Sequence, residues 1–140
     1  MPDQGKKFMR VILLVVLIFI SGYSFAGTKD KTSQCLEGLK SDAKFSSIAS
    51  HLELDGQSTG TMLADKARPD GLQKGAIADW IDARSACVNL SPSQVAIGLH
   101  MAFLSIVTDL YNGQETFGEF NKKWQELFNE VTKIHGKQVN

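Results

Sequence analysis

Residues 95–134 decide the fold class, and they read VAIGLHMAFLSIVTDLYNGQETFGEFNKKWQELFNEVTKI. Apolar residues recur every three or four positions on both sides of Asn112-Gly113, and this period predicts two amphipathic α-helices. The Asn-Gly pair ends the first helix, and Thr116 with Glu119 forms a capping box that starts the second. Because the connection between them is so short, the two helices should pack antiparallel.

Both helices carry a wide apolar face that should contribute to the core. The first face consists of Val95, Leu99, Ala102, Phe103, Ile106, Val107 and Leu110. The second face consists of Phe117, Phe120, Trp124, Leu127, Phe128, Val131 and Ile134. Aromatic residues at helical spacing are far more often core than ligand contacts. Ile97 lies outside the first face, and a single exposed isoleucine indicates no binding surface.

A third helix should precede this pair. Pro69 suits the first position of a helix, because its fixed φ is helical and it lacks an N–H that would be left unpaired. This helix should run to about Asn89. Its apolar stripe consists of Ala76 or Ile77, then Trp80, Ile81, Cys87 and Val88. Ser91, followed by a proline, should cap the start of the next helix.

The segment before Pro69 is less regular. Residues 28–32 are polar and should fray. Between residues 35 and 52, two apolar sets point to different faces, so we expect a short helix to Lys40 and a restart capped by Ser41 or Asp42. Residues 55–61 should form a loop. Since no strand-like alternation competes, the sequence predicts an all-α fold, a small bundle of about four main helical pieces.

The first 26 residues have the composition of a secretory signal peptide. Its basic residues are Lys6, Lys7 and Arg10. They precede an apolar run at residues 11–20, which is shorter than the about 20 residues that span a bilayer. Ser24 and Ala26 fit the small-residue pattern of a cleavage site after Ala26, with an uncleaved membrane anchor as the alternative. We therefore expect residues 27–140 to form one exported domain, periplasmic or secreted.

The charge of that domain is nearly balanced. The whole chain has 15 basic and 15 acidic residues, and the leader takes three basic and one acidic residue from these totals. The remaining 12 basic and 14 acidic residues give a net charge of −2 with histidine neutral. No basic stripe remains, so the sequence predicts no nucleic-acid partner.

Both cysteines, Cys35 and Cys87, follow the leader. Two cysteines in an oxidising compartment predict one disulfide, and two free buried thiols are the alternative. The histidines His51, His100 and His135 are scattered, and the sequence has no Cys-x-x-Cys or His-x-x-x-His pair. We therefore expect no metal site and no cofactor.

Arg84 is the candidate site residue, because it falls within the apolar stripe of its helix, four residues after Trp80. A buried charge needs a carboxylate or several carbonyls. By topology, the nearest counter-charges are Asp42, Asp65 and Asp109, and we favour Asp65, whose loop has little else to anchor it. The first interpretation is a structural ion pair or a carbonyl clamp. The second is the cationic floor of an anion-binding pocket, and the third is an arginine that reaches solvent.

Two short motifs carry a resemblance. They are Cys35 followed by Trp80-x-x-x-Arg84-x-x-Cys87, and Gly113-x-x-Thr116-Phe117-Gly118-x-Phe120. In these motifs the chain resembles small exported or lipid-anchored helical proteins of Gram-negative bacteria, over about residues 35–123. The resemblance implies an exported protein with paired cysteines, and it implies no activity.

The sequence contains no catalytic, nucleotide-binding or metal-binding motif. The leading hypothesis is therefore a non-enzymatic interaction module that docks another envelope or extracellular protein through a helix face or groove. A carrier of a small anionic or amphipathic ligand, with Arg84 in an interhelical pocket, is the alternative, and an enzyme of unknown type is the third. A cavity around Arg84 would favour the carrier, whereas a solid core with an exposed apolar patch would favour the docking module.

Overall fold

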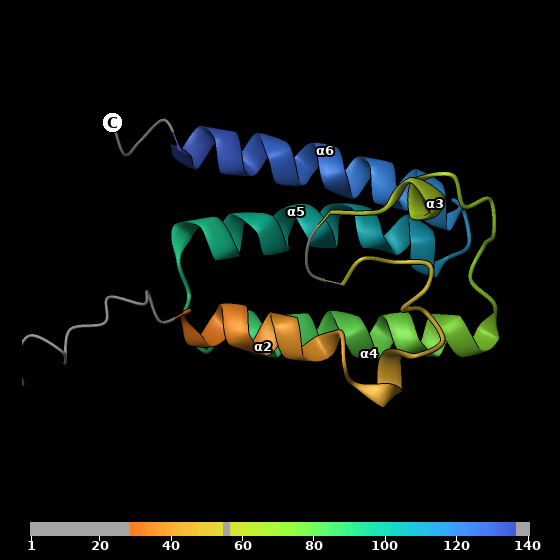
Figure 1. Ribbon diagram of the computed structural model, residues 1–140, viewed down its shortest axis with the longest axis horizontal. Coiled ribbons are helices and arrows are strands. Elements are labelled where there is room, and N and C mark those ends of the chain that lie inside the picture. The colour runs from red at the N-terminus through yellow and green to blue at the C-terminus, as the bar shows by residue number, and fades with distance from the viewer. Residues whose placement is uncertain (1–28, 55–56, 137–140) are drawn as a thin grey trace, which may run out of the picture.

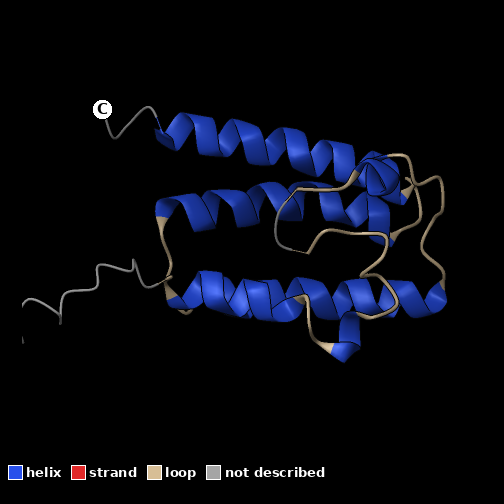
Figure 2. Ribbon diagram, in the orientation of Figure 1, coloured by secondary structure: helices blue, strands red, loops and turns tan. Residues whose placement is uncertain are grey.

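The computed structural model describes residues 29–54 and 57–136, so the expected leader and its cleavage site lie outside the described residues. The described chain is all-helical and contains no strand (Figure 2). Its elements are α2 (Lys31–Leu39), the 3-10 turn η1 (Ala43–Phe45), α3 (Gly60–Leu63), α4 (Gly71–Val88), α5 (Gln94–Tyr111) and α6 (Phe117–Gly136). The predicted all-α fold with four main helices is confirmed.

The three long helices run up and down in chain order (Figure 1). α5 packs against both α4 and α6, and α2 packs against α4. The short α3 lies against the start of α6. The antiparallel pairing predicted for the last two helices is therefore confirmed. Its turn contains Gly113 at φ +71°, a left-handed conformation that glycine adopts without strain.

Two helix starts differ from the prediction. α4 begins two residues after Pro69, because Asp70 and Gln73 form a reciprocal capping box that satisfies the first free N–H groups. α5 begins after Ser93, whose hydroxyl accepts a hydrogen bond from the Ala96 N–H. Ser91 is not the cap, since its backbone N–H donates to the Thr32 hydroxyl instead.

The restart after α2 also differs from the prediction. Asp42 is the N-cap as expected, but the element that it starts is the single 3-10 turn η1, followed by turns to residue 51. This winding chain buries Phe45, Ile48 and Leu52 against α4 and its neighbours. A straight helix has only one core face, so irregular turns are what bring these side chains into one core.

The core is aromatic at its centre. Phe103 lies in edge-to-face contact with Trp80, Phe120 and Trp124, at ring-centre distances of 4.9, 6.3 and 5.8 Å. These three contacts join α4, α5 and α6. The expected apolar faces are confirmed except at Ile134, which is 51% exposed near the end of α6.

The predicted disulfide is present. Cys35 in α2 is bonded to Cys87 in the last turn of α4, with a Cα–Cα distance of 5.4 Å. Thr32 lies beside it in α2 and is buried, so the predicted fraying is wrong for this residue, whereas Lys29 and Asp30 are exposed and precede the helix. The Thr32 hydroxyl donates to the Cys87 carbonyl at 2.8 Å and accepts from the Ser91 N–H at 3.1 Å. The disulfide and this hydroxyl together hold α2 on the end of α4.

Candidate functional site

Arg84 is buried in the middle of α4, with 4% of its surface exposed. Its guanidinium carbon lies 4.6 Å from the ring centre of Phe103 and 5.3 Å from that of Trp124. The Trp80 ring centre lies 5.8 Å away. One guanidinium nitrogen donates a 3.2 Å hydrogen bond to the Leu54 carbonyl. The burial that the sequence predicts is confirmed, and one of the expected contacts, a carbonyl clamp from helix to loop, is present.

The expected partner Asp65 lies elsewhere. Its carboxylate is 2.5 Å from His51 Nδ1 and accepts a 2.8 Å hydrogen bond from the Ala67 N–H. The prediction that Asp65 pairs with Arg84 is wrong, because the segment after α3 packs against the start of α6. There, the Asp65 carbonyl accepts from the Gly118 N–H.

The other two candidate carboxylates are exposed and occupied by other groups. Asp42 accepts from the Lys44 N–H at the cap of η1. Asp109 lies 3.8 Å from the amino group of Lys123. The positions of both residues in exposed parts of the fold explain why neither is paired with a buried guanidinium.

Arg84 is nearly inaccessible to solvent. None of the four surface pockets that we describe among residues 29–54 and 57–136 includes it. Aromatic rings of α4, α5 and α6 lie beside the guanidinium, with ring centres 4.6–5.8 Å from its carbon. Such contacts stabilise a buried cation within the bundle.

A serine–histidine pair links α4 to α5, and sequence reasoning missed it. Ser85 Oγ lies 2.9 Å from His100 Nε2 and also donates a hydrogen bond to the Ile81 carbonyl. Burial, and then the nearby charge of Arg84, lower the pKa of His100 below its ordinary value. With the hydroxyl donating to the Ile81 carbonyl, the Nε2–H tautomer of His100 donates to Ser85, and this hydrogen bond joins α4 to α5.

A second side-chain pair that contains a histidine, His51 with Asp65, lies near the start of α6. His51 is paired with Asp65 and stacks on Phe117, with ring centres 4.4 Å apart. Burial raises the pKa of the Asp65 carboxyl, but hydrogen bonds from His51 and the Ala67 N–H outweigh burial and lower it. The Asn121 side chain holds the His51 carbonyl at 2.8 Å. The His51–Asp65 contact joins the turns after η1 to the segment that follows α3.

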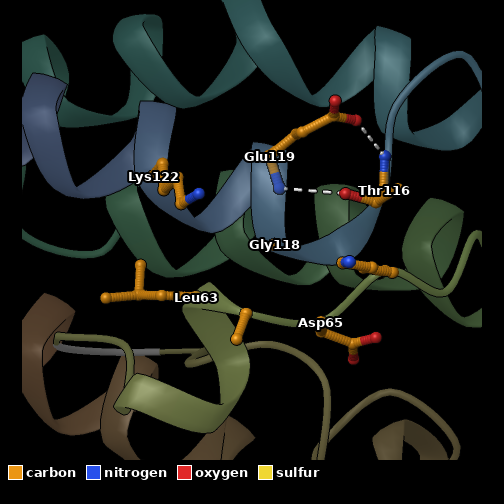
Figure 3. A pocket seen from close by; sticks show the side chains of 8 residues that line it. Leu63, Asp65, Thr116, Gly118, Glu119 and Lys122 are labelled. Carbon is orange, nitrogen blue, oxygen red and sulfur yellow. Dashed lines mark hydrogen bonds between the residues drawn. The ribbon is translucent and has the colours of Figure 1, made fainter.

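An open groove of about 450 Å³ lies between the α3 segment and α6. Figure 3 shows Leu63 and Asp65 on one wall and Gly118, Glu119 and Lys122 on the other. The Glu119 side chain turns back to accept from the Thr116 N–H, which confirms the predicted capping box. The carboxylates of Asp65 and Glu119 in this groove therefore both accept hydrogen bonds from within the protein.

The largest feature that sequence reasoning missed is an exposed apolar stripe along α5. Ile97, Met101, Leu104 and Tyr111 are 48%, 62%, 36% and 41% exposed. Ile97 is thus not a single exposed residue, as expected, but the first of four. By length and composition, α5 is also the one helix among the described residues that could cross a membrane, a test that core helices of soluble proteins pass too.

No family model matches the chain, and comparisons with curated proteins and with solved structures find no significant match. Within residues 29–54 and 57–136, no group of three or more His, Cys, Asp or Glu side chains is placed to hold a metal ion. The candidate site must therefore be judged on its own geometry.

Proposed function

We propose that this protein is an exported, non-enzymatic interaction module that docks another envelope protein through the exposed face of α5. The leader composition of residues 1–26 supports export. The Cys35–Cys87 disulfide is compatible with an oxidising compartment. The resemblance to exported helical proteins of Gram-negative bacteria points to the same periplasmic or secreted location.

The observation that carries the proposal is the α5 stripe. Only three residues of α5 are buried, namely Phe103, Val107 and Leu110, although the helix is apolar on most of its surface. A run of exposed apolar side chains on one helix face is typical of surfaces that bind another helix or groove. These side chains contribute little to the core, and exposed apolar side chains lower the solubility of a protein. A partner that covers them would account for their presence on this face.

The two alternatives have weaker support. A ligand carrier would need an accessible cavity at Arg84, whereas this side chain is 4% exposed and has aromatic rings beside it. An enzyme would need an activated nucleophile, and the Ser85 hydroxyl donates to the Ile81 carbonyl. These geometries favour docking over both alternatives.

Site-specific photo-crosslinking in intact cells tests the proposal. A photoreactive residue replaces Met101 in one variant and Leu72 in the other, since Leu72 is 76% exposed on α4 and lies off the stripe. We expect Met101→photoreactive chains to form a discrete adduct with a protein of the envelope fraction. The Leu72 control should give no such adduct.

An absence of adducts at Met101 and at Leu104, in cells that export the chain normally, would refute docking through this face. Adducts of equal yield at Leu72 would also refute it, because they would show random encounter. Mass spectrometry of the adduct identifies the partner.

A further inference from the structure

The exposed stripe of α5 has the spacing of a coiled-coil seam. The seam consists of the exposed residues Gln94, Ile97, Met101, Leu104, Thr108 and Tyr111, and the other exposed residues of α5, Ser105 and Asp109, lie beside it. The intervals alternate between three and four residues, which is the a/d pattern of a heptad repeat. A seam of this kind fits the side of another helix over its whole length, so the partner surface should itself be a helix with the same repeat.

This seam is complementary to itself. In an antiparallel arrangement about a two-fold axis at the middle of α5, Met101 meets Leu104 of the second copy, and Ile97 meets Thr108 of the second copy. The end positions, Gln94 and Tyr111, pair in the same register, so both helices are covered from end to end. From this symmetry we propose that the protein bound at the α5 face is a second copy of this chain. The proposal rests on the proposed docking function of that face.

The charges of α5 agree with self-pairing. Asp109 is its one acidic residue, α5 has no lysine or arginine, and none of the six seam positions is charged. Two copies therefore meet without bringing like charges together. A helix that binds an anionic lipid surface usually carries lysine or arginine beside its apolar stripe. The absence of both from α5 therefore argues against this partner. A charged partner protein would find no complementary charge on the seam.

Helix α6 packs directly beside one edge of the seam. Gly98 lies at this edge. The contacts of Gly98 with Val131 and His135 are at van der Waals distance, so α6 lies directly next to the seam. Ile134, also exposed, follows on α6.

The area of this face predicts a weak dimer. Stable interfaces use roughly 20–30 residues on each side and bury about 1,600 Å² in total. The six seam residues and their neighbours make up less than half of that number, so the buried area falls in the range of transient complexes. We therefore expect a dissociation constant between about 1 μM and 1 mM.

Sedimentation velocity tests the proposal on protein purified from cells that express the full chain. The sedimentation coefficient should rise from the monomer value toward the dimer value as the concentration approaches about 1 mM. Met101→Lys and Leu104→Glu should each weaken self-association at least about tenfold, because each leaves a charge against an apolar side chain of the second copy. Both residues are exposed, so the melting temperature should not change. Leu72→Lys is the matched control and should associate like the wild type.

Mixing variants tests the register. Met101→Lys mixed with Leu104→Glu should restore a dimer, because the antiparallel register places the new amino group against the new carboxylate. Met101→Lys mixed with Thr108→Glu should not, since these positions do not meet. A wild-type chain that stays monomeric near 1 mM would overturn self-pairing, as would a dimer that Met101→Lys leaves intact. Flotation of wild-type protein with phosphatidylcholine vesicles, lost in Met101→Lys, would also overturn it by assigning the face to lipid.

The two proposals fail separately. Photo-crosslinked adducts at Met101 that contain a different protein, combined with a monomeric chain, would refute self-pairing and keep the docking function. The absence of both adducts and dimers would refute both proposals.

Discussion

Arg84 keeps a positive charge inside an aromatic core, where its guanidinium has aromatic rings and a backbone carbonyl beside it. Taking the charge out of water costs several kcal/mol. Cation–π contact in a desolvated site returns about 2 kcal/mol, and a hydrogen bond from a charged group returns about 1.5–3 kcal/mol. The rings of Phe103 and Trp124 and the Leu54 carbonyl supply these contacts. The desolvation cost and the stabilisation from these contacts are of similar size. A substitution should therefore destabilise the fold most when it keeps the charge but removes some of the contacts.

The first prediction compares two substitutions at this position. Arg84→Lys should lower the free energy of unfolding by about 2 kcal/mol or more, because an ammonium cannot stack on the rings and reach Leu54 at once. Arg84→Met removes the charge together with its desolvation cost and should be the milder change. Urea denaturation of both variants measures the difference. A lysine variant as stable as the wild type would contradict the clamp.

His100 gives the fold a pH dependence near neutrality. Its pKa is lowered in the folded protein, first by burial and then by Arg84, whereas the unfolded chain should titrate at about 6.5. Above that pH the imidazole is neutral in both states and contributes no pH dependence. As the pH falls below it, the unfolded state binds the proton first, so stability decreases until the folded pKa is passed.

The second prediction follows from this difference. His100→Gln keeps a donor for Ser85 but does not titrate, so its free energy of unfolding should decrease less between pH 7 and pH 5 than that of the wild type (about pH 6.5 marks the onset). Chemical denaturation at a series of pH values measures both curves. Parallel curves would show that His100 does not carry the effect.

At the scale of elements, α3 and α6 approach so closely that their contact requires glycine at position 118. A Cβ at this position would lie 2.5 Å from the Asp65 carbonyl oxygen and 2.7 Å from that of Leu63. Both atoms belong to the backbone, so neither can rotate away. The Gly118 N–H also donates to the Asp65 carbonyl at 2.8 Å. This close approach gives a structural reason for the glycine in the Thr116-Phe117-Gly118 motif.

The third prediction contrasts two glycines. Gly118→Ala should lower the free energy of unfolding by about 1–3 kcal/mol, because the added methyl group forces the α3 segment away from α6. Gly75→Ala is the matched control, since nothing lies within 4 Å of its Cβ position in α4. It should raise the stability by about 0.5–1 kcal/mol through helix propensity. Equal effects in thermal denaturation would mean that the α3 segment is not held against α6.

The sequence predicts the helices themselves better than their partners. The periodic apolar faces identify α4, α5 and α6, and the capping box of Thr116 identifies the start of α6. Local signals compete at the other starts, where Asp70 replaces Pro69 and Ser93 replaces Ser91. The partner of Asp65 depends on how a long loop crosses the bundle, and no local pattern encodes such a path. The a/d spacing of the α5 stripe is present in the sequence. Because the core face of the same helix is also apolar, the pattern of apolar residues does not separate the two faces.

At the scale of the whole molecule, the bundle depends on how α2 is held. α5 and α6 are joined by a short turn and pack along their lengths, whereas α2 has nine residues and packs mainly on α4. So short a helix is marginal without tertiary contacts. The Cys35–Cys87 bond and the buried Thr32 hydroxyl supply those contacts at one end. Leu39 and the turns after it supply them at the other.

The fourth prediction separates the contributions of the bond and the hydroxyl. The disulfide closes a segment with a sequence separation of 52, for which the chain-entropy relation gives about 4 kcal/mol. The paired substitution Cys35→Ser with Cys87→Ser should approach that loss in urea denaturation without leaving a free thiol. Thr32→Val keeps the shape of the side chain but leaves the Ser91 N–H unsatisfied and removes one of the hydrogen bonds to the Cys87 carbonyl, so it should cost about 1–3 kcal/mol. Because both changes act on the same contact between α2 and α4, the triple variant should lose less than the sum of the separate effects. Strict additivity would mean that α2 stays docked without the bond, and two reactive thiols in the unreduced, denatured wild type would show that no bond forms.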